Sequence, residues 1–274
     1  TRGTLVETSN YCFGEGGAGT YSDGKLYTRI KDREAVAQVL DTLVQHGADP
    51  QIAVESRPHI GSNRLPQILI HLRDALQAEG VTYLWEEQVV GLLRDGRGRL
   101  CGVACASGRE VPGDAVVLAV GHSARGMYQV LHQSGVALQA KAFAVGARVE
   151  HRQPLIDQIQ YGRAAGHPLL PAAFYQLSTQ SNDRGVYSFC MCPGGWIVPS
   201  ATEAGGLCVN GMSLKRRDSP FANSALVVTV EPRDFGFFDP RIDAASDPLA
   251  GVAFQREIER RAFRAGGDSY HAVA

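Results

Sequence analysis

The sequence predicts a protein of the α/β class, α+β overall, with two domains. Over the first half, two amphipathic helical patterns, a strand meander and an apolar run ending at a glycine turn follow one another. This order is typical of an α/β nucleotide-binding domain. From about Phe143, short strands are joined by loops rich in Gly, Pro and Asn, which indicates a second, mixed-sheet domain. We expect the first domain over residues 1–141 and the second, incomplete, over residues 142–274.

The first domain should open with a loop, because residues 13–24 hold too many glycines for a regular element. A helical segment is expected over about residues 32–64, and a further helix from there to Gly80. Asp32 is the expected N-cap of the first helix, which ends at Gly47. The apolar positions recur at helical spacing at Val36, Val39, Leu40, Leu43 and Val44, and then at Leu65, Ile68, Leu69, Leu72 and Leu76.

Strands are expected next, at residues 81–85, 88–93, 99–105 and 109–111, with a turn at Asp95 and a hairpin turn at Ser107–Gly108. Residues 115–120 (AVVLAV) are apolar without alternation, as is typical of a strand buried on both faces. A glycine turn and a helix over residues 124–133 follow. In the second domain we expect strands at 143–150, 186–192, 206–212 and 225–231, and a helix at 254–263.

The bulk composition excludes several classes of protein. The formal net charge is −1, from 27 basic and 28 acidic residues, so no basic field attracts nucleic acid or an anionic membrane. No apolar run approaches the ~18 residues of a membrane span, and no signal peptide is visible. Six cysteines are too few for a disulfide scaffold at this length, which favours a reducing, cytoplasmic setting.

Two glycine features are candidates for ligand binding. Clustered glycines over residues 14–20 let backbone N–H groups approach a phosphate or a planar ring. Gly121 follows the predicted buried strand, where ligands of α/β sheets bind. An ordinary loop and an ordinary strand-to-helix turn are equally valid interpretations.

These segments also carry a resemblance to a known family. The matching motifs are residues 9–26 (SNYCFGEGGAGTYSDGKL), 58–61 (PHIG), 118–125 (LAVGHSAR), 142–146 (AFAVG), 187–195 (YSFCMCPGG), 210–213 (NGMS), 222–225 (ANSA) and 247–251 (DPLAG). The chain resembles the bacterial NAD(FAD)-utilising dehydrogenases, FAD-dependent oxidoreductases with a glutathione-reductase-like FAD domain. The resemblance implies that residues 1–141 are the remainder of such an FAD-binding domain and that residues 142–274 belong to a substrate domain. It also implies a protein of roughly twice this length, so we expect an internal fragment without the opening G-x-G-x-x-G turn and the late FAD segment.

The resemblance implies a set of flavin-facing residues and two candidate catalytic residues. The implied cofactor-binding residues are Gly16, Gly17, Ala18, Gly19, Thr20, Ser22, Val89, Gly121, His122 and Ser123. Lys25 is the first candidate catalytic residue, because a cation near flavin N1 stabilises the reduced anion; a solvated lysine after a turn is the alternative. His122 is the second, as a general acid or base, although loop histidines commonly serve only as hydrogen-bonding groups.

Cys190 and Cys192 form a C-x-C pair with two interpretations. A redox pair near the flavin is chemically feasible, but ordinary packed thiols are the more common case, and a C-x-C disulfide ring is strained. A zinc site from this pair and Cys208 has no clear fourth ligand, so no metal is expected.

The function implied is an FAD-dependent oxidoreductase that transfers a hydride or electron pair between a reductant, with NAD(P)H as the candidate, and an unidentified small-molecule substrate. Two alternatives remain open: a flavin-dependent RNA-modifying protein, against which the near-neutral charge argues, and a non-catalytic remnant unable to hold FAD. Neither the substrate nor the oligomeric state can be derived from the sequence.

Overall fold

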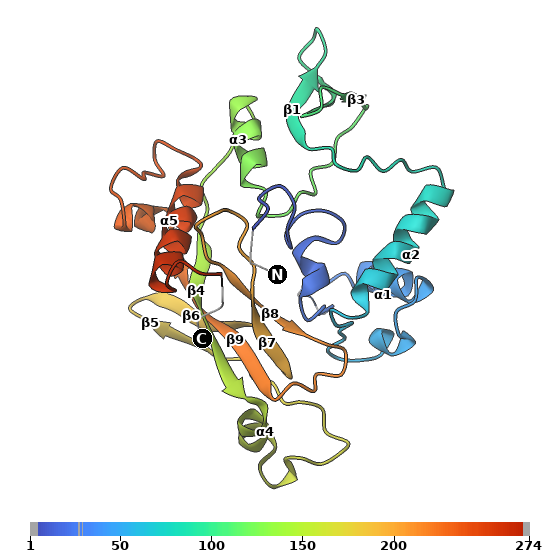
Figure 1. Ribbon diagram of the computed structural model, residues 1–274, viewed down its shortest axis with the longest axis vertical. Coiled ribbons are helices and arrows are strands. Elements are labelled where there is room, and N and C mark those ends of the chain that lie inside the picture. The colour runs from blue at the N-terminus through green and yellow to red at the C-terminus, as the bar shows by residue number, and fades with distance from the viewer. Residues whose placement is uncertain (1–4, 27, 29, 271–274) are drawn as a thin grey trace. The chain divides into compact units, whose positions relative to one another are not determined.

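The computed structural model describes residues 5–26, 28 and 30–270. Figure 1 shows its helices and antiparallel sheets, the α+β arrangement that the sequence predicts. The helices are α1 (Arg33–Gln45), α2 (Leu65–Ala78), α3 (Arg125–Gln133), α4 (Gln153–Tyr161) and α5 (Ala250–Ala265), with short 3-10 helices η1 (Gly17–Tyr21), η2 (Pro50–Ala53), η3 (Gly162–Ala164) and η4 (Pro232–Phe237). The strands are β1 (Val89–Arg94), β2 (Leu100–Cys105), β3 (Glu110–Pro112), β4 (Phe143–Arg152), β5 (Ser178–Ser181), β6 (Arg184–Cys192), β7 (Gly195–Pro199), β8 (Val209–Ser213) and β9 (Phe221–Val230).

The chain divides into two compact units, and each is described by itself. Unit 1 comprises the described residues of Thr1–Ala78, Phe143–Val230 and Ile258–Ala274, and unit 2 comprises Glu79–Ala142 and Glu231–Glu257. The predicted domain boundary after residue 141 stays a prediction. The outer ends of the two predicted domains, residues 1–4 and 271–274, lie outside the described residues.

Unit 1 is organised around an antiparallel sheet in the order β4-β9-β6-β5. Strands β4 and β9 pair over their full length, from Phe143 opposite Val230 to Arg152 opposite Phe221. Strands β7 and β8 form a separate two-stranded sheet. A small apolar core of Ile156, Ala173, Met191 and Ala222 joins α4 to the large sheet. These strands bring the segments around residues 190, 213 and 223 into one region.

The helical part of unit 1 follows the predicted pattern. The Asp32 carboxylate accepts a hydrogen bond from the Ala35 amide at 3.0 Å and caps α1. Gly47, with φ of 105°, turns the chain in the left-handed region just after α1 ends. The predicted apolar stripes pack in part on a core of Ala48, Ile52, Ile60 and Ile68, through Leu40, Leu43 and Val44 of α1 and Leu65 and Leu72 of α2, whereas Val39 and Leu76 are exposed. This core supports the segment around Ile60 that reaches the site described below.

Unit 2 holds the predicted meander and the helix that follows it. Strands β1, β2 and β3 form an antiparallel sheet in that order, and α3 covers the predicted helix at residues 124–133 almost completely. Phe235 of η4 packs on Phe254 of α5 with ring centroids 5.6 Å apart. The predicted strands at residues 88–93, 99–105 and 109–111 are therefore confirmed to within about a residue or two.

Two predicted strands are wrong. Residues 115–120 form no regular element, and Val117 is 87% exposed instead of buried on both faces. Residues 81–85 are likewise irregular, although Tyr83 and Trp85 stack at 5.4 Å. A strand exists only where a neighbour completes its hydrogen bonds, and no described segment pairs with either stretch. Apolar composition alone misled the prediction, because it indicates burial but supplies no partner.

Smaller differences concern the second half of the chain. Strand β8 begins at Val209 rather than at residue 206, and β9 begins at Phe221, four residues before the predicted start. Strands β5 and β7 and helix α4 were not predicted. Within the described residues, no helix combines the length and apolar character needed to cross a membrane.

Candidate thiol and lysine site

The site begins with two charged residues that flank a glycine. Gly24, between Asp23 and Lys25, turns the chain with a left-handed φ of 67°, and Lys25 Nζ lies 3.1 Å from Asp23 Oδ2. The segment runs antiparallel to residues 58–61, with Lys25 opposite His59, and the Ile60 amide donates to the Gly24 carbonyl at 3.0 Å. The backbone therefore presents the carboxylate and the ammonium group together.

Two cysteines reach the same place from the end of β6. Strand β6 loses its regular register with β9 between Phe189 and Cys192, and Cys190 adopts a left-handed φ of 48°, unusual for a residue with a side chain. Such bulges redirect side chains and are common beside functional sites. Cys190 is partly exposed and Cys192 is fully buried, so a reagent in solution can reach only Cys190 directly.

Asp23 is the buried anion of the site, with 0% of its surface exposed. It accepts hydrogen bonds from the Ser213 hydroxyl and from Arg217, whose Nε lies 3.1 Å from Oδ1 and whose Nη2 contacts Oδ2. Lys25 Nζ completes the set at 3.1 Å from Oδ2. Two cations thus surround one carboxylate, as a buried charge requires.

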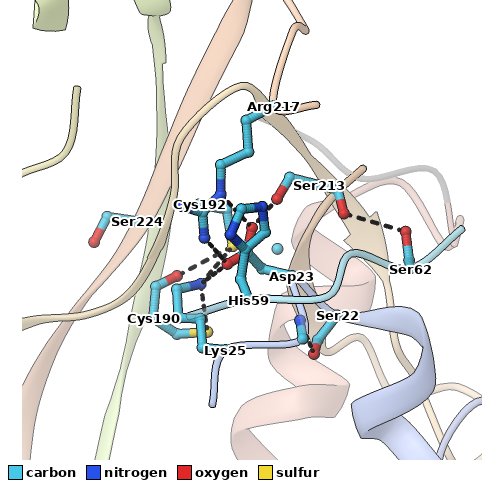
Figure 2. Close-up of polar contacts among 12 residues, drawn as sticks. Ser22, Asp23, Lys25, His59, Ser62, Cys190, Cys192, Ser213, Arg217 and Ser224 are labelled. Carbon is cyan, nitrogen blue, oxygen red and sulfur yellow. Dashed lines mark hydrogen bonds and ion pairs between the residues drawn. The ribbon is translucent and has the colours of Figure 1, made fainter. Parts of the chain in front are cut away.

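Lys25 links this carboxylate to the thiols. Its Nζ lies 3.4 Å from Cys192 Sγ and 3.9 Å from Cys190 Sγ, and its side chain is only 14% exposed. Figure 2 shows the three side chains converging next to Asp23 and Arg217. The ammonium group can therefore neutralise negative charge on either sulfur.

Arg148 adds a further cation on the strand side. From β4, it donates to Asn223 Oδ1 at 2.5 Å and to the Cys190 carbonyl at 3.1 Å. The Nδ2 of Asn223 is buried and, among the described residues, has no hydrogen-bond acceptor. Since buried amide groups are nearly always satisfied, this nitrogen is a donor suited to a bound molecule.

Glycines make the close approach of these strands possible. A Cβ on Gly211 of β8 would lie 2.5 Å from Arg148 Nη1, 2.5 Å from Asn223 Oδ1 and 2.7 Å from Cys192 Sγ. A Cβ on Gly61 or Gly194 would overlap the backbone of the loop after β8, at Lys215 and Arg217 respectively. Side chains at these positions would displace the residues of the site.

The surroundings polarise the two thiols in opposite directions. The hydrogen bond from the Cys192 thiol is the largest influence on Cys190 and outweighs burial; with the charges of Lys25 and Arg148 it lowers the pKa of Cys190 to about 5. The same hydrogen bond, reinforced by burial, raises the pKa of Cys192 far above its ordinary value. At neutral pH the pair is therefore a Cys190 thiolate beside a Cys192 thiol.

The remaining ionisable groups keep fixed charges near neutral pH. Burial acts against the charged form of Asp23, but Arg217 and Lys25 outweigh it and lower the pKa of Asp23. Burial also acts on Lys25, but its interactions with the cysteine pair and with the Asp23 carboxylate outweigh burial and raise the pKa of Lys25. Burial and the Arg217 charge lower the pKa of His59, so its ring is neutral, with Nε2 donating to the Lys215 carbonyl at 3.0 Å.

The predicted glycine loop also lies in unit 1. Gly16 and Gly17 adopt left-handed φ values of 77° and 52°, and Gly17–Tyr21 forms η1. The Ser22 hydroxyl donates to the Gly19 carbonyl at 2.9 Å. A Cβ added to Gly19 would have no neighbouring atom within 4 Å. The buried Thr20 hydroxyl has no hydrogen-bond partner among the described residues. Ala18 is half-buried at the centre of the loop.

The other predicted cofactor residues lie in unit 2. Val89 opens β1 and pairs with Cys105. Gly121 has φ of 72° and open space around it. Ser123 Oγ lies 3.4 Å from Nε2 of the exposed His122. All these assignments, and the catalytic roles predicted for Lys25 and His122, stay predictions.

Sequence reasoning considered Lys25 and the cysteine pair separately, and the structure brings them together. It did not anticipate Asp23, Arg148, Ser213, Arg217 and Asn223. Asp23 lies two residues before Lys25, which is a local signal. The others come from strands and loops more than 120 residues away, and no spacing in the sequence encodes that contact.

Comparisons with known proteins bear on the cofactor. Residues 142–274 match a family profile described as FAD-dependent protein, C-terminal domain-like. The match supports a flavoprotein. An uncharacterised protein of Clostridium beijerinckii (strain ATCC 51743 / NCIMB 8052) is 45% identical over 273 residues. The alignment covers 98% of this chain and 49% of that relative, so the chain spans about half of the relative's length. The similarity extends through the glycine loop as well as the cysteine pair.

Proposed function

We propose that the protein acts as an FAD-dependent oxidoreductase that moves a hydride or an electron pair between a reductant of the NAD(P)H type and a small-molecule substrate. One observation carries the proposal: in a chain similar to FAD-dependent proteins, the ammonium group of the largely buried Lys25 lies 3.9 Å from Cys190 Sγ, and the surroundings lower the pKa of Cys190 to about 5. Thiolates and flavins exchange electron pairs readily, because both are two-electron redox groups.

The glycine loop fits a cofactor in part. The open space over Gly19 and Gly121 would admit a close backbone approach, and the unpartnered Thr20 hydroxyl is available to an acceptor. The glycine at position 16 is required for packing rather than for a cofactor, since a Cβ there would overlap the side chains of Leu69 and Thr20. In unit 1, the residues proposed to hold FAD are therefore Ala18 to Thr20 with Ser22. In unit 2, Val89 and residues 121–123 remain candidates from the sequence.

When bound, FAD would supply acceptance and release of the hydride or electron pair. The chain's own residues supply charges and hold the charged groups in position. Asp23 keeps Lys25 protonated and fixed in place, and Lys25 neutralises an anion at the reacting centre. The buried guanidinium of Arg217 holds Asp23 in turn. His122 remains the proposed acid or base at the glycine turn.

Reconstitution with FAD tests this proposal. This chain and the longer Clostridium beijerinckii relative would be purified, incubated with FAD, desalted and scanned for the visible flavin band. We expect the relative to retain flavin and NADH or NADPH to bleach it. Retention by the relative without bleaching by either nucleotide would refute the NAD(P)H reductant. Absence of flavin from both proteins would refute the cofactor itself.

A cytoplasmic location and the absence of nucleic-acid and membrane partners are not tested by these contacts and stay predictions. No specific contact favours an RNA-modifying protein or a non-catalytic remnant over the oxidoreductase.

A further inference from the structure

Cys190 and Cys192 differ in every property that separates an attacking thiol from a resolving one. Cys190 is partly exposed and lies beside two cations, Lys25 and Arg148, while Cys192 is fully buried and its sulfur lies 3.4 Å from Lys25 Nζ. The attacking thiol of a dithiol pair must be ionised and accessible, and the second thiol needs only to reach the first.

The backbone brings both sulfurs to the same lysine. The left-handed Cys190 and the bulge at the end of β6 interrupt the regular strand geometry that would separate alternate residues. Lys25 Nζ lies within 3.9 Å of both sulfurs, and the Cys192 thiol donates to the Cys190 carbonyl at 3.4 Å. Gly211 leaves the space that the Cys192 sulfur occupies. A strained backbone that is kept at one point, beside two thiols, indicates a role for their geometry.

We propose that Cys190 is the nucleophile and Cys192 the resolving thiol of a centre that reduces disulfide compounds, RSSR. This inference deepens the proposed function, because it names the substrate class and rests on that function for the source of electrons. Known flavin-linked dithiol centres belong to the FAD domain, whereas this pair lies on a strand of the segment that follows it.

The reaction balances in three steps. The Cys190 thiolate attacks one sulfur of RSSR, so the Cys190–SR bond forms, the RS–SR bond breaks and RS⁻ leaves. The Cys192 thiol then attacks the Cys190 sulfur, the second RS group leaves, and the Cys192 proton goes to it as RSH. The products are a Cys190–Cys192 disulfide, RS⁻ and RSH. A hydride equivalent, two electrons and one proton, from the NAD(P)H-type reductant of the proposed function restores the thiolate and the thiol.

The surroundings favour this direction of attack. Lys25 lies within 3.9 Å of both sulfurs, so it stabilises the thiolate before attack and a departing thiolate afterwards. Asn223 Nδ2 is a further buried donor that has no acceptor among the described residues. Both groups recognise a sulfur anion and require no particular R group.

The test is single-turnover reaction of the reduced chain with 2,2′-dithiodipyridine, without flavin, with the released thiopyridone followed by absorbance and the cysteine products mapped by mass spectrometry. At pH 6 we expect Cys190 to react about tenfold faster than an ordinary thiol, since its larger thiolate fraction outweighs its lower intrinsic nucleophilicity. The fast phase of the wild type should release two equivalents and leave the Cys190–Cys192 disulfide. Cys192→Ser should release one and trap the mixed disulfide on Cys190.

Cys190→Ser should lose the fast phase, and the exposed Cys208→Ser, as the control, should keep it. Cys192→Ala serves as a second variant, and circular dichroism of each variant confirms folding. A fast phase that persists in folded Cys190→Ser, or two equivalents released by folded Cys192→Ser, would overturn the proposal. Because no flavin is present, failure here leaves the flavin-binding result unaffected, and a flavin-free protein with intact exchange refutes only the proposed cofactor.

Discussion

Replacement of Lys25 by Met removes the cation nearest to both sulfurs while retaining a side chain of similar length. Its ammonium group lies 3.9 Å from Cys190 Sγ and 3.4 Å from Cys192 Sγ. The thiolate form of Cys190 then loses an attraction that the thiol form does not have, so the pKa of Cys190 rises. The reactivity of Cys190 at mildly acidic pH should fall.

The size of the effect follows from the distance. Two unit charges 3.9 Å apart attract by about 1 kcal/mol in water and by about 4 kcal/mol at an effective dielectric constant of about 20. The ratio of thiolate to thiol should therefore fall by roughly 6-fold to 1000-fold. A thiolate of higher pKa is intrinsically more nucleophilic, which offsets about half of the logarithm of this change. The observed rate at low pH should drop by roughly 2-fold to 30-fold.

The assay is alkylation by iodoacetamide between pH 5 and pH 7, with Cys190 quantified by peptide mass spectrometry. Lys25→Arg should preserve most of the rate because it keeps the charge, and the exposed Lys31→Met is the matched control for loss of a lysine. Urea unfolding of each variant separates a charge effect from misfolding. A folded Lys25→Met protein whose Cys190 reacts at the wild-type rate would refute the electrostatic argument.

The other predictions concern stability and its pH dependence. Asp23→Asn leaves the two cations Lys25 and Arg217 without their carboxylate and should lower the free energy of unfolding in urea by about 3–5 kcal/mol. The control Asp218→Asn, in an exposed ion pair, should lower it by about 0.5 kcal/mol or less. Equal losses in the two variants would contradict the burial argument. Gly211→Ala should lower the free energy of unfolding by about 1–3 kcal/mol through overpacking and should slow the reaction of Cys190. Gly126→Ala, on an open helix surface, should do neither. A Gly211→Ala variant with wild-type stability would show that the strands relax freely. Because the pKa of Cys190 is lowered from 9.0 to about 5 on folding, its contribution to stability is full above about pH 9 and is lost as the pH falls toward 5. The difference in unfolding free energy between wild type and Cys190→Ser should shrink over that range, and a difference that stays constant would exclude a thiolate in the folded state.

Helix ends and turns could be predicted where the residues that determine them are neighbours in the sequence. Asp32 and Gly47 mark the two ends of α1, because capping depends on side chains and backbone preferences within one turn. The meander in unit 2 follows from turn residues between alternating strands. The run at residues 115–120 failed because its apolar pattern requires partner strands, and pairing is a property of the fold rather than of the segment.

The candidate site likewise combines features that the sequence displays locally with contacts that only the fold creates. The glycine-rich segment and the C-x-C pair were visible as patterns, but their chemistry depends on what meets them. Lys25 and Cys192 are separated by 167 positions in the chain, and Asp23 meets Arg217 across 194. A packed C-x-C pair and a reactive one have the same sequence, so only the neighbouring charges distinguish them.

Those charges also explain why a thiolate is the natural state of Cys190. Among the charged groups described in contact at the site are three cations and one carboxylate: Lys25 and Arg217 contact Asp23, and Arg148 contacts the Cys190 carbonyl. A neutral Cys190 would leave two positive charges in excess in a largely buried region, which is costly. The thiolate removes one of them, and the remaining positive charge is available to a second anion. A disulfide substrate supplies that anion as its departing thiolate, so the charge balance that ionises Cys190 also favours the bond cleavage proposed for it.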